Sequence, residues 1–300
     1  MSEIPLPEPL VLTFAEVCDR GKVREENQDN VRHASIALGE LMLVADGMGG
    51  YRGGATASNI AAETFLAYLA SLPADYPPEQ AIREAAALAN GNIVGAASAP
   101  GSAYRRMGST VVLALITQNA TGTGAWIGHI GDSRAYLARA GQLTRITNDH
   151  STVQALLNRN LITPEEARNH PDASELTRSL GHQPEVEIDI DTVRLQDGDC
   201  LLLCSDGLWG FVQEQAIEAV AANSELRIET AAQSLLDLAL AAGGHDNIGI
   251  EMVRVAKAPV AFKPPRRTRF VTILGACLLA LAVLAALAWF ALKSHWLHGR

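Results

Sequence analysis

The chain has 300 residues, which is enough for one large domain or two small ones. Hydrophobic residues make up 48% of it and charged residues 19%, an ordinary globular composition. The formal net charge is -9, but residues 263–300 carry six basic side chains and no acidic one, so residues 1–262 have a net charge of -15. A body this acidic repels phosphate backbones, so we expect no nucleic-acid partner.

The chain opens with MSEIPLPEPL, which lacks the basic start and apolar core of a secretory signal, so no signal peptide is expected. Strands are predicted where short apolar or alternating runs end at turn residues. The predicted strands are 11–18, 41–45, 110–116, 124–130, 134–139, 185–193, 200–204 and 248–255, and residues 31–38 are strand-like.

Helices are predicted at 55–71, 79–97, 164–169 and 226–242, from their alanine-rich or capped sequences. Several strands are joined by turns too short for a crossover helix, as in GHIGDSRAYL, where two apolar runs meet at Gly131–Ser133. This pattern favours mostly antiparallel sheets with helices packed outside them.

The cysteines form no C-x-x-C pair and no Cys/His cluster with the spacing of a zinc site. A spacing of four along one strand places Cys200 and Cys204 on the same face. We expect reduced, buried thiols, as in a cytosolic protein, at Cys18, Cys200, Cys204 and Cys277.

Five aspartates stand where predicted strands meet loops. Asp46 and Asp206 each end an apolar run and precede a glycine, in LMLVADGMGG and LLLCSDGLWG. Asp29 is predicted in a polar loop, Asp132 in a hairpin, and Asp246 just before the last strand. Each alone is equally well interpreted as a turn former, but five together indicate a shared site.

Carboxylates gathered at strand ends repel one another unless a cation lies among them. Oxygen ligands without cysteine or a convincing histidine set favour Mg²⁺ or Mn²⁺ over zinc. Two such ions can share an aspartate, hold a hydroxide and bind a phosphoryl group for in-line attack. The glycines after Asp46 allow the backbone to approach closely, so that a main-chain carbonyl can face the ion or its water.

Eight motifs occur in one order: GKVREENQD, VADGMGG, GSTVVLAL, GDSRAYL, LTRITNDHS, HPDASELTRSLG, LLLCSDGLW and GHDNIGI. In this order they resemble the metal-dependent type-2C serine/threonine protein phosphatases, the PPM family, in their bacterial form. The resemblance covers about residues 8–255. It implies an α+β fold, a four-layer αββα sandwich of two antiparallel sheets flanked by helices, with metal bound at one edge.

The resemblance implies that Asp46 bridges two Mn²⁺ or Mg²⁺ ions. Asp206 and Asp246 would complete one site, while Asp29 and the Gly47 carbonyl would serve the other, directly or through water.

Two further residues match the family's pattern. Asp132 resembles the aspartate that, together with the position of Asp206, holds a weaker third ion. Arg24 stands where the family places an arginine on the substrate phosphate, which its planar fork suits better than lysine would. The alternative for Arg24 is a solvated loop cation.

The chain also departs from the family's pattern. Gln28 stands where many relatives carry Glu, and Met48 stands where animal members have a histidine, so that general acid is missing. His150 is interpreted as a hydrogen-bonded structural residue rather than as a replacement for that general acid. Residues 151–181 match the family's mobile flap beside the active site, and could recognise substrate or form a plain surface hairpin.

The last part of the chain has the pattern of a membrane anchor. Phe270–Leu292 is 23 residues long without a charge, about 34 Å as a helix, enough to cross a bilayer. Four basic residues precede it and two follow, which keeps the preceding domain in the cytoplasm under the positive-inside rule. The predicted organisation is a phosphatase domain at 1–257, a basic juxtamembrane linker at 258–269, a transmembrane helix at 270–292 and a short tail at 293–300.

The sequence therefore predicts a phosphatase tethered to the inner membrane by one span. It would hydrolyse phosphoserine and phosphothreonine with a two-metal-activated hydroxide. Phosphorylated proteins are the expected partners, among them a serine/threonine kinase and its substrates. Two alternatives stay open: a non-catalytic phosphoprotein-binding regulator with the same fold, and a different metal hydrolase such as a nuclease, which the acidic charge disfavours.

Overall fold

The computed structural model describes residues 10–49, 53–100, 102, 106–119, 122–168, 170–258 and 289. The chain divides into two compact units, residues 1–258 and 259–300. The predicted span at 270–292 and its flanking linker and tail lie outside the described residues, apart from position 289. No helix in the described part of the chain is long and apolar enough to cross a membrane.

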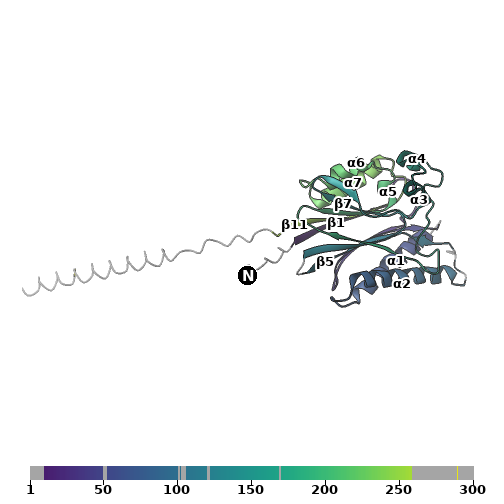
Figure 1. Cartoon of the computed structure of the whole chain (residues 1–300), viewed down its shortest axis with the longest axis horizontal. Coiled ribbons are helices and arrows are strands. Elements are labelled where there is room, and N and C mark those ends of the chain that lie inside the picture. Colours follow the sequence, from purple (N-terminus) through teal and green to yellow (C-terminus); the bar gives the residue numbers. More distant parts are fainter. Residues whose placement is uncertain are drawn as a thin grey trace, which may run out of the picture. The chain divides into compact units, whose positions relative to one another are not determined.

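Two antiparallel sheets form the centre of the first unit (Figure 1). The first sheet has the order β2 (Asp29–Ile36), β3 (Gly39–Met48), β5 (Val111–Asn119), β6 (Gly122–Ile130) and β9 (Asp189–Arg194), with β4 (Gly108–Ser109) paired to β3. The second has the order β1 (Leu10–Asp19), β11 (Ile248–Lys257), β10 (Cys200–Cys204), β7 (Arg134–Arg139) and β8 (Gln142–Arg145).

Helices cover the outer face of each sheet. Helices α1 (Gly53–Ala70) and α2 (Pro78–Ser98) pack on the first sheet, and α6 (Glu214–Ala221) and α7 (Ile228–Ala241) pack on the second (Figure 1). Three short helices lie in the connections: α3 (Thr152–Asn158), α4 (Pro164–Arg168) and α5 (Asp206–Trp209). The predicted four-layer arrangement of two antiparallel sheets flanked by helices is confirmed.

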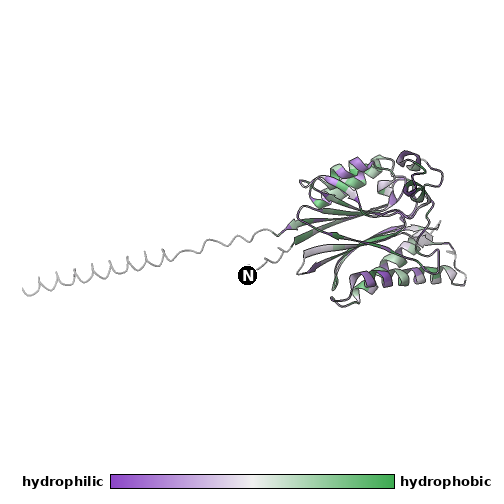
Figure 2. Ribbon diagram, viewed as in Figure 1, coloured by the Kyte–Doolittle hydropathy of each residue, from purple (hydrophilic) through white to green (hydrophobic). Residues whose placement is uncertain are grey.

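The apolar run of β3 fits a strand covered on both faces. Its side chains alternate, so Leu41 and Leu43 pack under the helices while Met42 and Val44 pack between the sheets. The outer helices are amphipathic, with apolar stripes toward the sheets and polar residues toward solvent (Figure 2). A central strand of this kind is rigid, which makes its end a good position for a functional side chain.

Most predicted elements agree with the structure to within a few residues. The predicted strand 185–193 is an exception, because β9 begins only at Asp189. The elements that the sequence did not predict are short: β4, β8, α3, α5 and α6. Segments of two to eight residues show too few periods of apolar residues to be recognised, and their stability comes from tertiary packing.

Three local predictions were wrong. Asp29 is the first residue of β2 rather than part of the preceding loop. Asp132 does not lie in a hairpin, because β6 and β7 belong to different sheets and the chain crosses between them at Gly131, whose φ is +102°. Cys18 is exposed at the end of the edge strand β1, whereas Cys200 and Cys204 are buried and free as predicted. Cys277 lies outside the described residues.

A buried carboxyl group links the two sheets. Glu251 of β11 is fully buried, and its Oε2 accepts a hydrogen bond of 2.8 Å from the backbone N–H of Leu43 in β3. Its Oε1 has no hydrogen-bond partner among the described residues. Burial raises the pKa of Glu251 well above its usual value, so the group is neutral inside the sandwich.

Candidate metal centre

The five aspartates singled out in the sequence come together at one edge of the sandwich. A cavity of about 570 Å³ opens there, lined by side chains from segments far apart in the chain. Its lining includes Arg24, Asp46, Gly47, Asp132, Asp206 and Asp246. Asp29 lies behind this lining, directly opposite Asp46 in the register of β2 and β3.

Asp46 is at the centre of the group. Its carboxyl lies within hydrogen-bonding reach of the carboxyls of both Asp29 and Asp206. The backbone of Asp46 is held by Thr110, which donates its N–H to the Asp46 carbonyl at 2.8 Å and accepts from the Asp46 N–H through Oγ1 at 3.1 Å. The end of β3 is therefore fixed on the side of β5, and the carboxyl it carries has a defined position.

Asp29 is buried and only half satisfied. Its Oδ2 accepts a hydrogen bond of 2.6 Å from the Ser205 hydroxyl, which in turn accepts from the Gly249 N–H. Its Oδ1 is buried without a partner among the described residues. Buried carboxylate oxygens normally have a hydrogen-bond donor or a cation as partner. An oxygen without a donor, beside other carboxylates, therefore has the environment of a cation ligand.

Asp206 and Asp246 are brought together by the packing of two turns. Asp206 begins α5, and the next residue, Gly207, packs so closely that a Cβ atom there would lie 1.8 Å from the Asn247 carbonyl oxygen. The Asn247 amide then fastens the loop that carries Arg24. Its Nδ2 donates to the carbonyl oxygens of Arg20 and Glu26, and its Oδ1 accepts from the Gln28 N–H.

Electrostatics show how unfavourable this group is without a cation. Burial, followed by the neighbouring carboxylates, raises the pKa of Asp29 to about 7 and that of Asp206 to about 6. The pKa values of Asp46 and Asp132 are raised well above their usual range, first by burial and then by nearby carboxylates. A divalent cation would offset both the burial of the charged carboxylates and their mutual repulsion. An all-oxygen donor set fits Mn²⁺ or Mg²⁺.

Gly47 follows Asp46 in a crowded backbone. A Cβ atom on it would lie 2.0 Å from the Gly54 carbonyl oxygen and 2.9 Å from that of Gln28. The Gly47 N–H donates to the Gln28 carbonyl at 3.1 Å. The close backbone approach predicted after Asp46 is therefore present, although Gly47 lies within β3 rather than in a turn, and glycine is required because no side chain fits.

Arg24 lies at the rim of the cavity. Its Nη2 is 2.7 Å from Oδ2 of Asp246, and its side chain is 53% exposed. It is thus neither a freely solvated cation nor a buried structural ion pair. The guanidinium partly offsets the negative charge of the site and faces the space that an anionic ligand would enter.

Residues 151–181 lie beside this cavity. Their outgoing part contains α3 and α4. Their returning part pairs with the start of the segment through the bridge Ser151–Leu176, and with the body through the bridge Ser109–Leu180. Ser174 and Leu176 line the cavity itself. The segment is therefore one wall of the site as well as a surface element.

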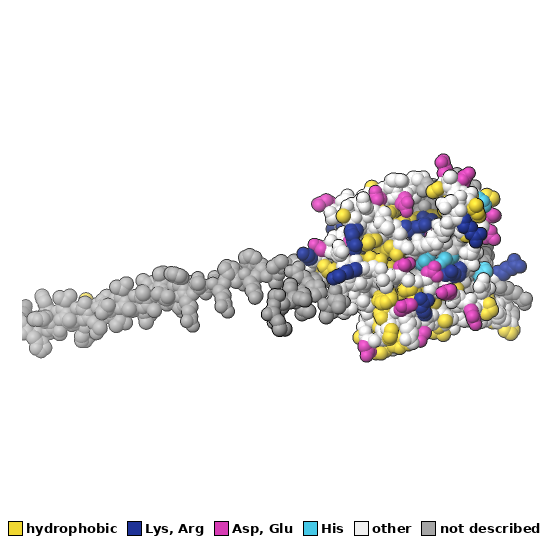
Figure 3. Space-filling model, viewed as in Figure 1, with side chains coloured by type: hydrophobic (Ala, Val, Ile, Leu, Met, Phe, Trp, Pro, Cys, Tyr) yellow, Lys and Arg dark blue, Asp and Glu magenta, His cyan; other side chains and the backbone are white. Residues whose placement is uncertain are grey.

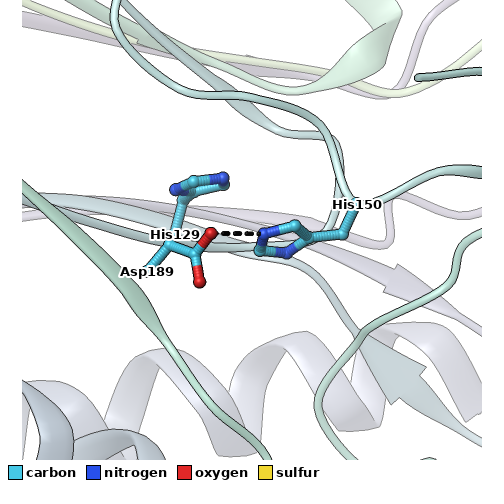
Figure 4. Close-up of side chains that lie close together, drawn as sticks. All are labelled: His129, His150 and Asp189. Atoms are coloured by element: carbon cyan, nitrogen blue, oxygen red, sulfur yellow. Dashed lines mark hydrogen bonds and ion pairs between the residues drawn. The ribbon is translucent and has the colours of Figure 1, made fainter. Parts of the chain in front are cut away.

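A second group of side chains was missed because its members are distant in sequence. His129, His150 and Asp189 bring three potential ligand atoms within 4.8 Å of one another, and none of the three lines the cavity of the aspartates (Figure 4). The rings of His129 and His150 are stacked with centroids 4.5 Å apart. Burial lowers the pKa of both histidines, which keeps them neutral.

The hydrogen bonds of this group favour a structural role. The Gly131 N–H donates to Nδ1 of His150 at 3.1 Å, so the ring proton is on Nε2, which donates to Asp189 at 3.1 Å. Arg178 donates to the other carboxylate oxygen of Asp189. His150 thereby holds the backbone next to Asp132, which agrees with the structural interpretation of this histidine.

Three residues that position the acids were not assigned from the sequence: Thr110, Ser205 and Asn247. Each lies in a quoted motif, Thr110 in GSTVVLAL, Ser205 in LLLCSDGLW and Asn247 in GHDNIGI, but none of the three was singled out. The hydroxyls of Thr110 and Ser205 act through contacts 64 and 176 residues away in sequence, and no local pattern reveals such contacts.

Comparison with known proteins identifies similar sequences. A family model described as protein phosphatase 2C matches residues 21–241. The serine/threonine protein phosphatase PstP of Mycobacterium tuberculosis is 38% identical over 249 residues, which are 82% of this chain and 45% of PstP. Protein phosphatase PhpP of Streptococcus pneumoniae is 37% identical over 239 residues, 78% of this chain and 94% of PhpP. The chain thus matches less than half the length of the mycobacterial relative and nearly all of the streptococcal one.

Solved structures share the fold. The catalytic domain of PstP, in a crystal structure in complex with 2 manganese ions, superposes with a TM-score of 0.72 at 34% sequence identity, covering 83% of this chain and 100% of that domain. The serine/threonine phosphatase of S. agalactiae gives a TM-score of 0.73 at 30% identity, covering 81% of this chain and 99% of that one.

We expect Mn²⁺ to stabilise the protein more at pH 8 than at pH 5. The raised pKa values of Asp29 and Asp206 mean that, without metal, the contribution of these two groups to stability is greatest below about pH 4 and is lost as the pH rises toward about 7. Mn²⁺ binds the deprotonated carboxylates, so it restores stability at the higher pH, where these carboxylates are ionised. Melting temperatures of chelator-treated protein with and without Mn²⁺ test this, and an equal shift at both pH values would contradict it.

Gly47→Ala should weaken Mn²⁺ binding by at least about tenfold, because the new methyl group has to displace the backbone beside Asp46. Gly95→Ala in α2 is the matched control. A Cβ at Gly95 meets nothing within 4 Å, and the change should leave Mn²⁺ binding unaltered. Isothermal titration of both variants with Mn²⁺ measures the difference. Equal affinities in the two variants would show that the turn is not part of the site.

Proposed function

The chain belongs to the protein phosphatase 2C family, and we propose that it is a metal-dependent phosphatase acting on phosphoserine and phosphothreonine in proteins. The observation that carries this proposal is the set of five aspartates, four of which line one cavity with Asp29 behind them, and the buried Oδ1 of Asp29 is left unpartnered within the described structure. Phosphorylated proteins are accordingly the proposed substrates.

The residues present fit the metals of the family. Asp46 would be shared by two ions, with Asp206 and Asp246 serving one of them and Asp29 and Gly47 the other. Asp132 lines the same cavity as Asp206 and would hold a weaker third ion together with it. The crystal structure of the PstP catalytic domain with 2 manganese ions supports this assignment. When bound, Mn²⁺ or Mg²⁺ supplies an activated hydroxide as nucleophile and neutralises charge on the phosphoryl group.

The chain's own residues bind and orient the phosphate. Arg24 would exchange its contact with Asp246 for two phosphoryl oxygens, because its fork matches them and its side chain is already at the rim. Thr110 and Asn247 keep the acidic side chains in place during this exchange. The described residues that line the cavity include no cysteine or histidine, so we propose direct attack without a phosphoenzyme, and a solvent proton for the leaving oxygen.

A non-catalytic regulator with the same fold is the alternative, and the acids argue against it. Buried carboxylates that repel one another lower stability in the metal-free protein, and a scaffold would gain nothing from them. A nuclease is disfavoured by the net charge of -15 on residues 1–262. On the face seen in Figure 3, basic side chains are interspersed with acidic ones.

We further propose that residues 270–292 anchor the enzyme in the inner membrane with its catalytic domain in the cytoplasm. The uncharged span and the four basic residues before it, against two after it, support this orientation. A serine/threonine kinase and its substrates at the same membrane are then the proposed partners.

Asp46→Asn and Asp206→Asn should each lower kcat/KM by at least about a hundredfold, because the ions they hold supply several kcal/mol of charge stabilisation. The control is Asp237→Asn, an exposed carboxylate on α7, which should leave activity unchanged. Hydrolysis of p-nitrophenyl phosphate and of a phosphothreonine peptide, with Mn²⁺ and then with chelator, measures this. Full activity in either site variant with Mn²⁺ present would refute the assignment.

The full chain should sediment with membranes and resist extraction with alkaline carbonate, whereas a chain ending at Ala258 should stay in the supernatant. The shorter chain retains all three cores of the first unit, so it should fold and keep its activity. Leu281→Arg in the full chain is a milder variant, since an arginine at the centre of a span costs about 2.5–3.5 kcal/mol. A full chain found entirely in the soluble fraction would remove the anchor from the proposal.

A further inference from the structure

A second cavity, of about 860 Å³, opens directly from the catalytic one. The two cavities share Asp132, Ser174 and Asp206 in their linings. One wall of the second cavity comes from α3 and α4, and the other from the residues that join α5 to α6. We call it the flap groove. A polypeptide whose phosphorylated residue lies among the aspartates has this groove beside it.

The basic side chains of the flap groove already have partners. Arg134 donates to both carboxylate oxygens of Asp149, at 2.6 and 3.0 Å, and its guanidinium lies 3.4 Å from the ring centroid of Trp209. Arg145 is 3.5 Å from Asp149 and donates to Gln154 at 3.0 Å. Both arginines are thus held by contacts within the protein, which makes them less available to an acidic peptide.

Several of the groups that remain open to a ligand are apolar. Val153 and Leu157 of α3 are half-buried in one wall, and Phe211 lies in the other wall with 40% of its surface exposed. A large apolar residue that stays exposed beside an active site has no role in the core of the fold. An apolar side chain placed between these walls would remove further apolar surface from water on both sides.

Another, smaller cavity of about 450 Å³ also adjoins the catalytic one and shares Met48, Ser174 and Leu176 with it. Apart from these, its lining residues are polar: Glu175, Thr177, Arg178, Ser179, His182 and Gln183. Among the described residues, large apolar side chains outside the shared lining, such as Leu157 and Phe211, therefore occur in the flap groove and not in this smaller cavity.

We propose that the flap groove binds the substrate polypeptide on one side of the phosphorylated residue and selects a large apolar side chain there. This inference rests on the proposed phosphatase function, and the occupant is argued from the continuity of the two cavities. The enzyme then prefers phosphoproteins with an apolar residue on the side of the phosphorylated residue that lies in the groove.

Three phosphothreonine peptides test the preference. One carries leucines only before the phosphothreonine, one only after it, and in the third serines replace all leucines. We expect one of the two leucine peptides to exceed the serine peptide about tenfold in kcat/KM, from partial burial of a leucine side chain. The other leucine peptide should resemble the serine peptide. Equal values for all three peptides would overturn the proposal.

Substitutions on opposite walls locate the effect. Leu157→Asn and Phe211→Ser should each reduce the tenfold preference to about twofold or less. The preference is a ratio between peptides in one sample, so a loss of folded protein does not change it. Leu161→Asn is the matched control, since Leu161 belongs to the same flap, is 63% exposed and does not line the groove. A preference that survives both groove variants, or that falls equally in the control, would overturn the proposal.

A binding measurement separates this proposal from the catalytic one. If neither the peptides nor p-nitrophenyl phosphate are hydrolysed, the phosphatase function fails, and fluorescence anisotropy of labelled peptides still decides the groove. The favoured leucine peptide should then bind about tenfold more tightly than the serine peptide, and lose this advantage in Leu157→Asn. Equal affinities would show that the groove does not select an apolar residue.

Discussion

Electrostatic repulsion among buried carboxylates is the constraint on which the site depends. Asp29 and Asp132 are buried and Asp46 and Asp206 are half-buried, and each has a raised pKa because removal from water and its neighbours disfavour the charged form. Such a group is stable only when the fold holds the side chains together by other forces. Apolar packing in three clusters supplies those forces, and it lies mostly on β-strands whose ends carry the acids.

In the sandwich, the acidic side chains lie near the ends of strands that belong to both sheets. Asp46 ends a strand of the first sheet that is buried on both faces, and Asp206 follows the central strand β10 of the second. Hydroxyl and amide groups then join the sheets at this edge, as Ser205 does for Asp29 and Asn247 does for the loop of Arg24. The rigid scaffold keeps like charges at close range, which leaves a strong site for divalent cations.

The flap links the chemistry of the site to recognition of the substrate. Its returning segment provides Ser174 and Leu176 to the catalytic cavity, and its helix α3 provides Leu157 to the groove beside it. The same segment carries Arg178, which is joined through Asp189 and His150 to the backbone before Asp132. The flap residues proposed to contact the substrate and the residues that fix the backbone beside Asp132 are therefore joined by hydrogen bonds and by the chain of the flap itself.

Local pattern was enough to predict mostly antiparallel sheets with helices outside them, the long strands, the main helices and the acids, because period-2 and helical repeats are encoded by neighbouring residues. The four-layer αββα arrangement and the predicted roles of those acids came from resemblance to a family. Tertiary structure alone decided which side chains meet: Asp29 with Ser205 across 176 residues, His150 with Asp189, and Leu157 with Phe211 across the groove. The reason is physical. Hydrogen bonds and cavities depend on how separate elements pack, and packing depends on all their surfaces at once, whereas a sequence pattern reports only the face that one element buries.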